Sequence, residues 1–125
     1  MPQREQDPER EERIAMEIIA DAYGPDEQAL GWYYYLKENL AFPFTARCIR
    51  ERATSPLEVG DEIDVVGMPP EEECEREMFV NVRCQPRPLA VPLSQLKFVH
   101  AEVGAEETEQ AVADWHYWVD RGYRF

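Results

Sequence analysis

The sequence has few of the side chains that hold zinc or build a disulfide framework. It contains two histidines and three cysteines. Cys48, Cys74 and Cys84 are far apart, and no two of them have the CxxC spacing. Structural zinc needs cysteine and histidine ligands clustered at short spacings, and a disulfide scaffold needs an even set. Both classes are therefore disfavoured. We expect Cys48 and Cys84, which lie in strand-like segments, to be buried structural thiols.

The motifs of catalysis and of phosphate binding are also missing. All six glycines stand alone, so the chain has no glycine-rich phosphate loop. No serine lies in a GxSxG turn. His116 has Asp114 nearby, but it lies in the aromatic segment DWHYWV, where a packed histidine is much more common than a general base. The sequence predicts a protein that is not an enzyme.

Long apolar runs are absent as well. No segment approaches the roughly 18–20 apolar residues of a membrane span. The first residues, MPQREQDPEREERIAMEI, carry charges where an export signal needs an apolar core. We therefore expect a cytoplasmic protein with no membrane partner.

Positive charge is scarce. Thirteen Lys and Arg against 26 Asp and Glu give a formal net charge of −13. Affinity for nucleic acid comes largely from neutralised phosphates, so nucleic acid is not an expected partner. The charge suits metal cations or a basic protein partner, or it serves solubility alone. Mutual repulsion between copies of the chain favours a monomer.

What the sequence does contain is helix at both ends. Asp7-Pro8 is a typical N-cap and first helical residue, and apolar side chains then recur on one face as far as Ala22. Gly24-Pro25 ends this helix, and a second apolar face runs to Leu40. The pattern predicts helices at about residues 8–23, 25–40 and 105–120.

The middle of the chain has the period of strands. Between residues 45 and 99, short alternating segments are separated by Gly and Pro. In EIDVVGM, Ile63 and Val65 alternate with Glu62 and Asp64. Five such segments predict a small, strongly bent antiparallel sheet or barrel. The expected fold is one α+β domain over residues 1–125, with two N-terminal helices, a small SH3-like antiparallel β-barrel at about 45–99 and a C-terminal helix.

Acidic residues are concentrated between Glu58 and Glu77, where nine of twenty residues are Asp or Glu and Arg76 is the only base. Calcium takes six to eight oxygen ligands in forgiving geometry, so acids of this kind are candidate ligands although no EF-hand loop is present. A merely solvated surface, or a surface that meets a basic partner protein, explains the same acids.

Three acidic groupings are candidate metal sites. Backbone carbonyls and the negative end of the helix dipole converge at the end of the second helix, beside Glu38. The second grouping lies at the start of a strand, and the third is a loop of glutamates. The candidate ligands in these groupings are Glu38; Asp61, Glu62 and Asp64; and Glu71 with the following Glu72, Glu73, Glu75 and Glu77.

Four successive blocks of the sequence carry a resemblance. GWYYYLKENLAFPFTARC, PLEVGDEIDVVGM, AVPLSQLKFV and DWHYWVDRGYRF resemble, in this order, the signatures of the cyanobacterial calcium-binding protein family (CcbP type). The resemblance runs from about Arg13 to Phe125. It implies a small acidic protein that binds Ca²⁺ without an EF-hand, acts as a calcium buffer or sensor, and has no catalytic activity. Glu38 is the first candidate ligand, because it lies in one of these blocks and at a helix end.

Overall fold

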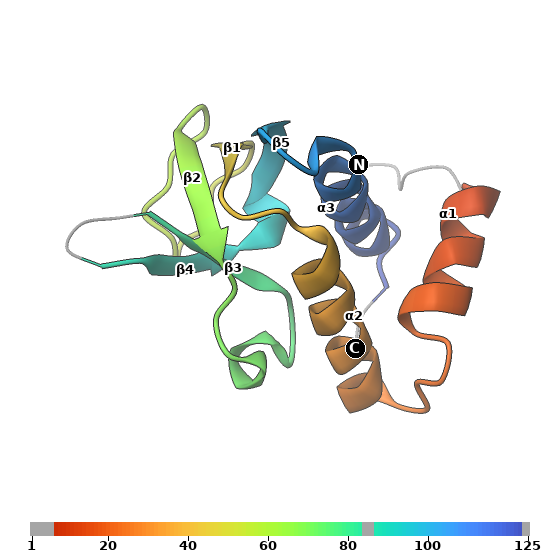
Figure 1. Cartoon of the computed structure of the whole chain (residues 1–125). Coiled ribbons are helices and arrows are strands. Elements are labelled where there is room, and N and C mark those ends of the chain that lie inside the picture. Colours follow the sequence, from red (N-terminus) through yellow and green to blue (C-terminus); the bar gives the residue numbers. More distant parts are fainter. Residues whose placement is uncertain (1–6, 84–86, 124–125) are drawn as a thin grey trace.

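The computed structural model describes residues 7–83 and 87–123 and shows an α+β fold (Figure 1). An antiparallel sheet forms one side of the molecule, and the helices pack together on the other. The helices are α1 (Pro8–Arg13), α2 (Pro25–Asn39) and α3 (Ala105–Asp120). The strands are β1 (Phe44–Cys48), β2 (Glu62–Gly67), β3 (Phe79–Val82), β4 (Leu89–Pro92) and β5 (Leu96–His100). Cys84, expected to be a buried thiol, lies outside the described residues.

The first helix is shorter than the expected range of residues 8–23. It begins as predicted, with the Asp7 carboxylate accepting a hydrogen bond from the backbone N–H of Arg10 at 3.1 Å. After α1 the chain continues in a π-helical segment, η1 (Ile14–Ile18), and then leaves the helix. A Cβ on Gly31 of α2 would lie only 2.2 Å from the carbonyl oxygen of Ile18. The end of η1 therefore packs directly on the backbone of α2, a long-range contact that helical periodicity does not report.

Aromatic side chains join α2 to α3. The ring of Trp32 is 5.1 Å from the ring of Trp115 and 5.6 Å from that of Trp118. Trp32 and Trp115 are almost completely buried. Such edge-on and tilted contacts bury large apolar areas in favourable ring geometries. The two long helices thus share one apolar seam, which the periodicity of each helix predicted.

The sheet has the strand order β4-β3-β2-β1-β5, with every neighbouring pair antiparallel. Val65 of β2 and Val80 and Val82 of β3 are buried, while Glu62 and Asp64 face solvent as the alternation predicted. A short 3₁₀ turn, η3 (Leu93–Gln95), leads from β4 to β5. In the part of the chain that the structure describes, β4 and β5 are the two edges and do not pair. The sheet is therefore open, and the closed barrel that we expected is not observed.

A buried carboxylate ties α1 to the other two helices. Asp114 of α3 is fully buried and receives Nη1 of Arg10 at 2.5 Å, Nη2 of Arg13 at 2.7 Å and the hydroxyl of Tyr35 at 2.6 Å. Burial and this hydrogen bond raise the pKa of Tyr35 to about 12, so the phenol remains a donor at neutral pH. Hydrogen bonding to Asp114 also raises the pKa of Arg13. We refer to these four side chains as the Asp114 clasp.

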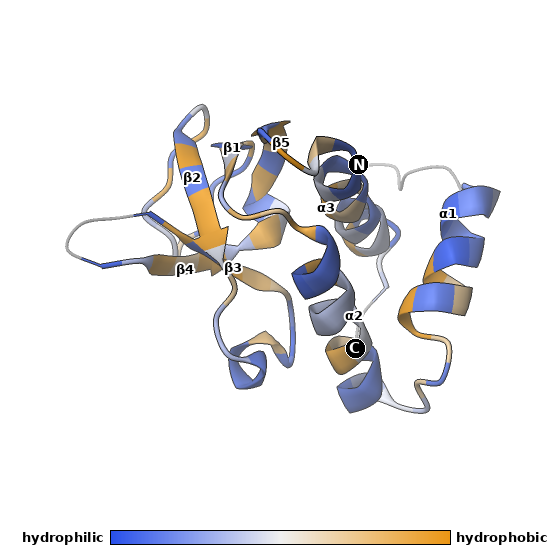
Figure 2. Cartoon of the chain, viewed as in Figure 1, coloured by the Kyte–Doolittle hydropathy of each residue, from blue (hydrophilic) through white to orange (hydrophobic). Residues whose placement is uncertain are grey.

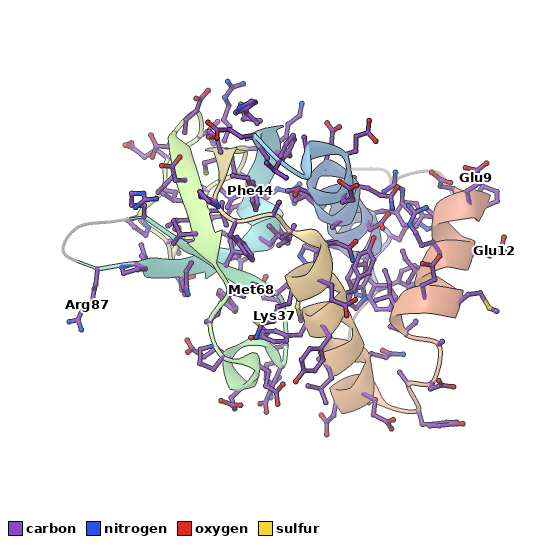
Figure 3. The ribbon with its side chains drawn as sticks, viewed as in Figure 1. Glu9, Glu12, Lys37, Phe44, Met68 and Arg87 are labelled. Atoms are coloured by element: carbon purple, nitrogen blue, oxygen red, sulfur yellow. The ribbon has the colours of Figure 1, made fainter. Side chains whose placement is uncertain are left out.

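The clasp attaches α1 to α2 and α3 through polar contacts. Pro8–Arg13 contains no buried residue, and the helix is largely hydrophilic (Figure 2). Its Glu9 and Glu12 side chains point away from the other helices (Figure 3). Apolar burial resumes only at Ile14 and Ile18 of η1. Charged hydrogen bonds therefore attach α1 to its neighbours, whereas apolar packing joins α2 to α3.

Candidate metal centre

Two of the predicted ligands on the sheet already have basic partners. Glu62 of β2 forms an ion pair with Arg47 of β1, the residue directly opposite in the register. Asp64 lies 3.4 Å from Nε of Arg83. All four side chains are about half exposed or more. A cation that bound either carboxylate would have to compete with an arginine.

Asp61 and Glu38 lie on different elements, Asp61 in the turn before β2 and Glu38 in the last turn of α2. The Asp61 carboxylate accepts the backbone N–H of Glu58 at 2.8 Å, which closes the turn before β2. Glu38 is exposed in the last turn of α2. The carbonyl of Leu36 accepts the N–H of Leu40 at 2.8 Å, and the carbonyl of Asn39 accepts the hydroxyl of Thr108 at 3.4 Å. The end of α2 is thus partly capped by the protein itself.

Glu71 is the predicted ligand that the fold brings together with further acids. The glutamates after Pro70 do not form an open loop but begin a 3₁₀ helix, η2 (Glu71–Cys74), which contacts α2. A cavity of about 200 Å³ lies between the two elements. Its lining residues are Asp26, Ala29 and Leu30 of α2, and Glu71, Glu72 and Glu75. We call this cavity and its four carboxylates the acidic pocket.

Buried contacts fix η2 in place beside α2. The hydroxyl of Tyr33 donates to the backbone carbonyl of Pro69 at 2.7 Å. The thiol of Cys74 is buried, and its sulfur accepts the N–H of Phe79 at 3.4 Å. Burial raises the pKa of Cys74, and the nearby Glu73 and Glu77 raise it further, so this thiol is an unreactive anchor. A run of four acidic or thiol residues is therefore held as an ordered turn.

The pocket is electrostatically unbalanced. No Lys or Arg is among its lining residues, whereas Glu77, just beyond it, pairs with Arg52 at 2.8 Å. The hydrogen bond from the Tyr34 hydroxyl to Glu71 raises the pKa of Tyr34. Burial, with Glu71 and Glu72 contributing, raises the pKa of Tyr33. Glu71 and Glu72 therefore contribute to the raised pKa of both tyrosines.

The donor set of the acidic pocket fits a hard cation. All four polar side chains present carboxylate oxygens, the ligands that calcium prefers, and none presents sulfur or imidazole. The carboxylates do not yet converge. Within residues 7–83 and 87–123, no group of three or more His, Cys, Asp or Glu side chains is close enough to hold an ion. Binding at this pocket therefore requires the carboxylates to rotate inward, which repulsion between them opposes until a cation is present.

Asp26 was not among the predicted ligands. Its sequence context, in the first turn of α2, indicates only a favourable interaction with the helix dipole. It meets Glu71 because α2 and η2 pack together across more than forty residues of chain. No local signal identifies this pairing.

Asp64 borders a second hollow of about 470 Å³. His100 and Glu102 also line it, together with apolar residues that include Phe42 and Phe44. Asp64 already has Arg83 as its partner, so this hollow offers fewer unpaired carboxylates than the acidic pocket does.

Comparison with known proteins places this acidic α+β fold in a class of calcium-binding proteins. A family model described as calcium binding, CcbP, matches residues 12–119. Two solved structures match the whole chain over their own whole length with 36% sequence identity. One is the crystal structure of Anabaena CcbP, with a TM-score of 0.84, and the other is a calcium-binding protein in its calcium-binding form, with a TM-score of 0.83. The chain belongs to the CcbP family of calcium-binding proteins. No curated protein matches it.

In the described residues, no helix is long and apolar enough to cross a membrane.

Proposed function

We propose that this protein binds Ca²⁺ in the acidic pocket, with Asp26, Glu71, Glu72 and Glu75 as ligands. The observation that carries the proposal is the set of four carboxylates around one cavity whose lining contains no basic side chain. Membership of a calcium-binding family supports calcium as the cation. Elsewhere, Glu62, Asp64 and Glu77 each have an arginine to offset their charge.

The pocket suits calcium better than magnesium. Calcium accepts six to eight oxygens at flexible angles, and carboxylates on two packed helices supply oxygens without strict symmetry. Magnesium demands a nearly ideal octahedron and gives up its water reluctantly. We therefore expect calcium to bind in the presence of millimolar magnesium, whereas a diffuse acidic surface would bind both ions weakly and lose both in salt.

The test is isothermal titration of calcium into chelator-treated protein at about 0.15 M salt, with and without magnesium. Glu71→Gln, Glu72→Gln and Glu75→Gln should each weaken binding, since each removes one charged oxygen ligand without changing shape. Glu12→Gln is the matched control, because Glu12 lies on α1 and points away from the rest of the molecule (Figure 3). If the pocket variants bind calcium as tightly as Glu12→Gln does, the acidic pocket is not the calcium site.

Glu38→Gln belongs in the same series. Glu38 lies outside the acidic pocket, and it is the first candidate ligand from the sequence because it lies in a resemblance block and at a helix end. Loss of affinity in Glu38→Gln, with the pocket variants unchanged, would move the proposed site to the end of α2. Asp61 remains a predicted ligand of the same kind.

We place the protein among calcium buffers. η2 is anchored before Glu71 by Tyr33 and within the 3₁₀ turn by Cys74, so carboxylate rotation alone can complete the site. A sensor requires a second state with a differently exposed surface. Near-ultraviolet circular dichroism of the Trp32, Trp115 and Trp118 cluster should stay unchanged on calcium addition. A large change would favour a sensor.

A basic partner protein is the alternative explanation of the acids. Of the three consecutive tyrosines on α2, only Tyr34 is well exposed, at 50%, while Tyr33 is buried. Tyr34 is moreover bonded to Glu71. A single exposed ring is not the contiguous apolar patch that marks an interface. This region therefore favours the cation over the partner.

A further inference from the structure

Tyr34 contacts the acidic pocket without lining it. Its hydroxyl donates a hydrogen bond to Oε2 of Glu71, which lies 37 residues further along the chain and on the facing element. Glu71 is half-buried, whereas the next two glutamates, Glu72 and Glu73, are exposed. The bond thus acts on the least exposed glutamate at the start of η2.

The preceding tyrosine fixes the backbone on which Glu71 is carried. The Tyr33 hydroxyl donates to the carbonyl of Pro69 at 2.7 Å, and this bond is buried. The rings of Tyr33 and Tyr34 meet edge to face, with centroids 5.3 Å apart. The Lys37 ammonium lies 5.7 Å from the centroid of the Tyr33 ring, outside the lining of the acidic pocket. Two adjacent phenols therefore hold the main chain before Glu71 and the carboxylate of Glu71 itself.

A phenol has an advantage over an arginine at this position. Arg47 holds Glu62 by neutralising it, and a cation must compete with that arginine. A neutral hydroxyl orients a carboxylate but leaves its negative charge available. Carboxylates that ligate metals are commonly hydrogen-bonded in this way, and loss of the bond typically weakens metal affinity about 10- to 100-fold.

We infer that Tyr34 is a positioning residue of the calcium site, which holds the Glu71 carboxylate in place for the cation through one neutral hydrogen bond. The inference rests on the proposed function of the acidic pocket. It assigns to an exposed aromatic residue a role in cation affinity rather than in binding a partner protein. Because the bond is on the surface, we expect the effect of its loss to be near the lower end of the range, about tenfold.

The experiment is a double-mutant cycle measured by calcium titration of the full chain. The proteins are the unchanged chain, Tyr34→Phe, Glu71→Gln and the double variant. Tyr34→Phe should weaken calcium binding about tenfold. It should have no further effect once Glu71 is Gln, because Tyr34 acts through that carboxylate. Tyr23→Phe is the matched control, since the side chain of Tyr23 is 91% exposed.

A purely structural role would give a different pattern. Tyr34→Phe would then weaken binding equally in both backgrounds, and it would lower the urea midpoint of the chelator-treated protein well below that of Tyr23→Phe. Either result overturns the inference, as does a Tyr34→Phe affinity within twofold of the unchanged chain. If Glu71→Gln weakens binding and Tyr34→Phe does not, only the role of Tyr34 fails. If Glu71→Gln, Glu72→Gln and Glu75→Gln all bind normally, the pocket and Tyr34 fail together.

Discussion

The Asp114 clasp and the acidic pocket show two ways in which this protein offsets negative charge. In the clasp, a single carboxylate with no solvent exposure is surrounded by Arg10, Arg13 and Tyr35. In the pocket, four carboxylates share a cavity with no basic lining residue. The first arrangement is complete within the chain, and the second is the one for which we propose a cation from outside. The carboxylate that joins the helices is paired with two arginines, whereas no basic side chain lines the acidic pocket.

Burial explains the difference. A carboxylate taken out of water loses several kcal/mol of hydration, and only good geometry and several hydrogen bonds compensate for that loss. Asp114 accepts bonds on both oxygens, including one from Nε of Arg13 at 3.0 Å. Glu72 and Glu75 remain exposed, so water hydrates them while no cation is bound. The pocket can therefore stay unpaired at little cost to folding, whereas the clasp cannot.

The largest expected effect comes from breaking the clasp. Asp114→Ala leaves Arg10 and Arg13 without their shared partner and Tyr35 without its acceptor. Removal of one member of a buried ion pair typically destabilises a protein by 3–5 kcal/mol, and we expect about 3 kcal/mol because both arginines are partly exposed. Urea unfolding in chelator measures the loss.

Glu72→Gln is the comparison variant for the clasp. It also removes one negative charge, but from an exposed residue of the pocket, so calcium-free stability should change by less than about 0.5 kcal/mol. Equal losses in the two variants would show that burial does not distinguish the two regions.

The second effect concerns the cation itself. If calcium binds the folded pocket and not the unfolded chain, a hundredfold excess over Kd should raise the free energy of unfolding by about 2.7 kcal/mol. Asp114→Ala should retain this calcium-dependent increment under conditions in which it is folded, because Asp114 is not a proposed ligand. Glu71→Gln should lose most of the increment. The measurement is the urea midpoint with calcium and with chelator. An increment that survives in Glu71→Gln would place the stabilising ion elsewhere.

Much of the fold was predictable because its signals are local. α3 begins and ends at the predicted residues, Ala105 and Asp120, and α2 ends one residue early, at Asn39. The apolar face and the flanking Gly and Pro specify those bounds. The prediction of the first helix ran too far, because helical structure ends at Ile18. There the chain packs against Gly31 of α2, a contact that the periodicity of the sequence does not report. The sequence also could not predict whether the sheet closes into a barrel, since β4 and β5 have the same alternation whether or not they pair.

The candidate site was predictable only in part for the same reason. The density of acids indicated a cation, and Glu71 was among the predicted ligands. Asp26 was missed because its partners come from a distant element. The sequence does not distinguish Glu62 and Asp64 from the other acids. The register of β1 and β2 places Arg47 opposite Glu62, and Arg83, just after β3, pairs with Asp64. Charge can be counted from a sequence, but the pairing of charges belongs to the tertiary structure.

The smallest expected effect tests the distinction between acids that have an arginine partner and acids that do not. Glu62→Gln removes an acid that Arg47 already neutralises, so calcium affinity should stay within twofold of the unchanged chain. Stability should fall by about 0.5 kcal/mol, the typical contribution of an exposed ion pair. Part of this loss arises because Arg47 then faces Lys97, its opposite residue on β5, without compensation. Titration and urea unfolding measure the two quantities. A clear loss of calcium affinity would mean that Arg47 yields Glu62 to the ion, and that paired acids of this sheet are as available as the unpaired acids of the pocket.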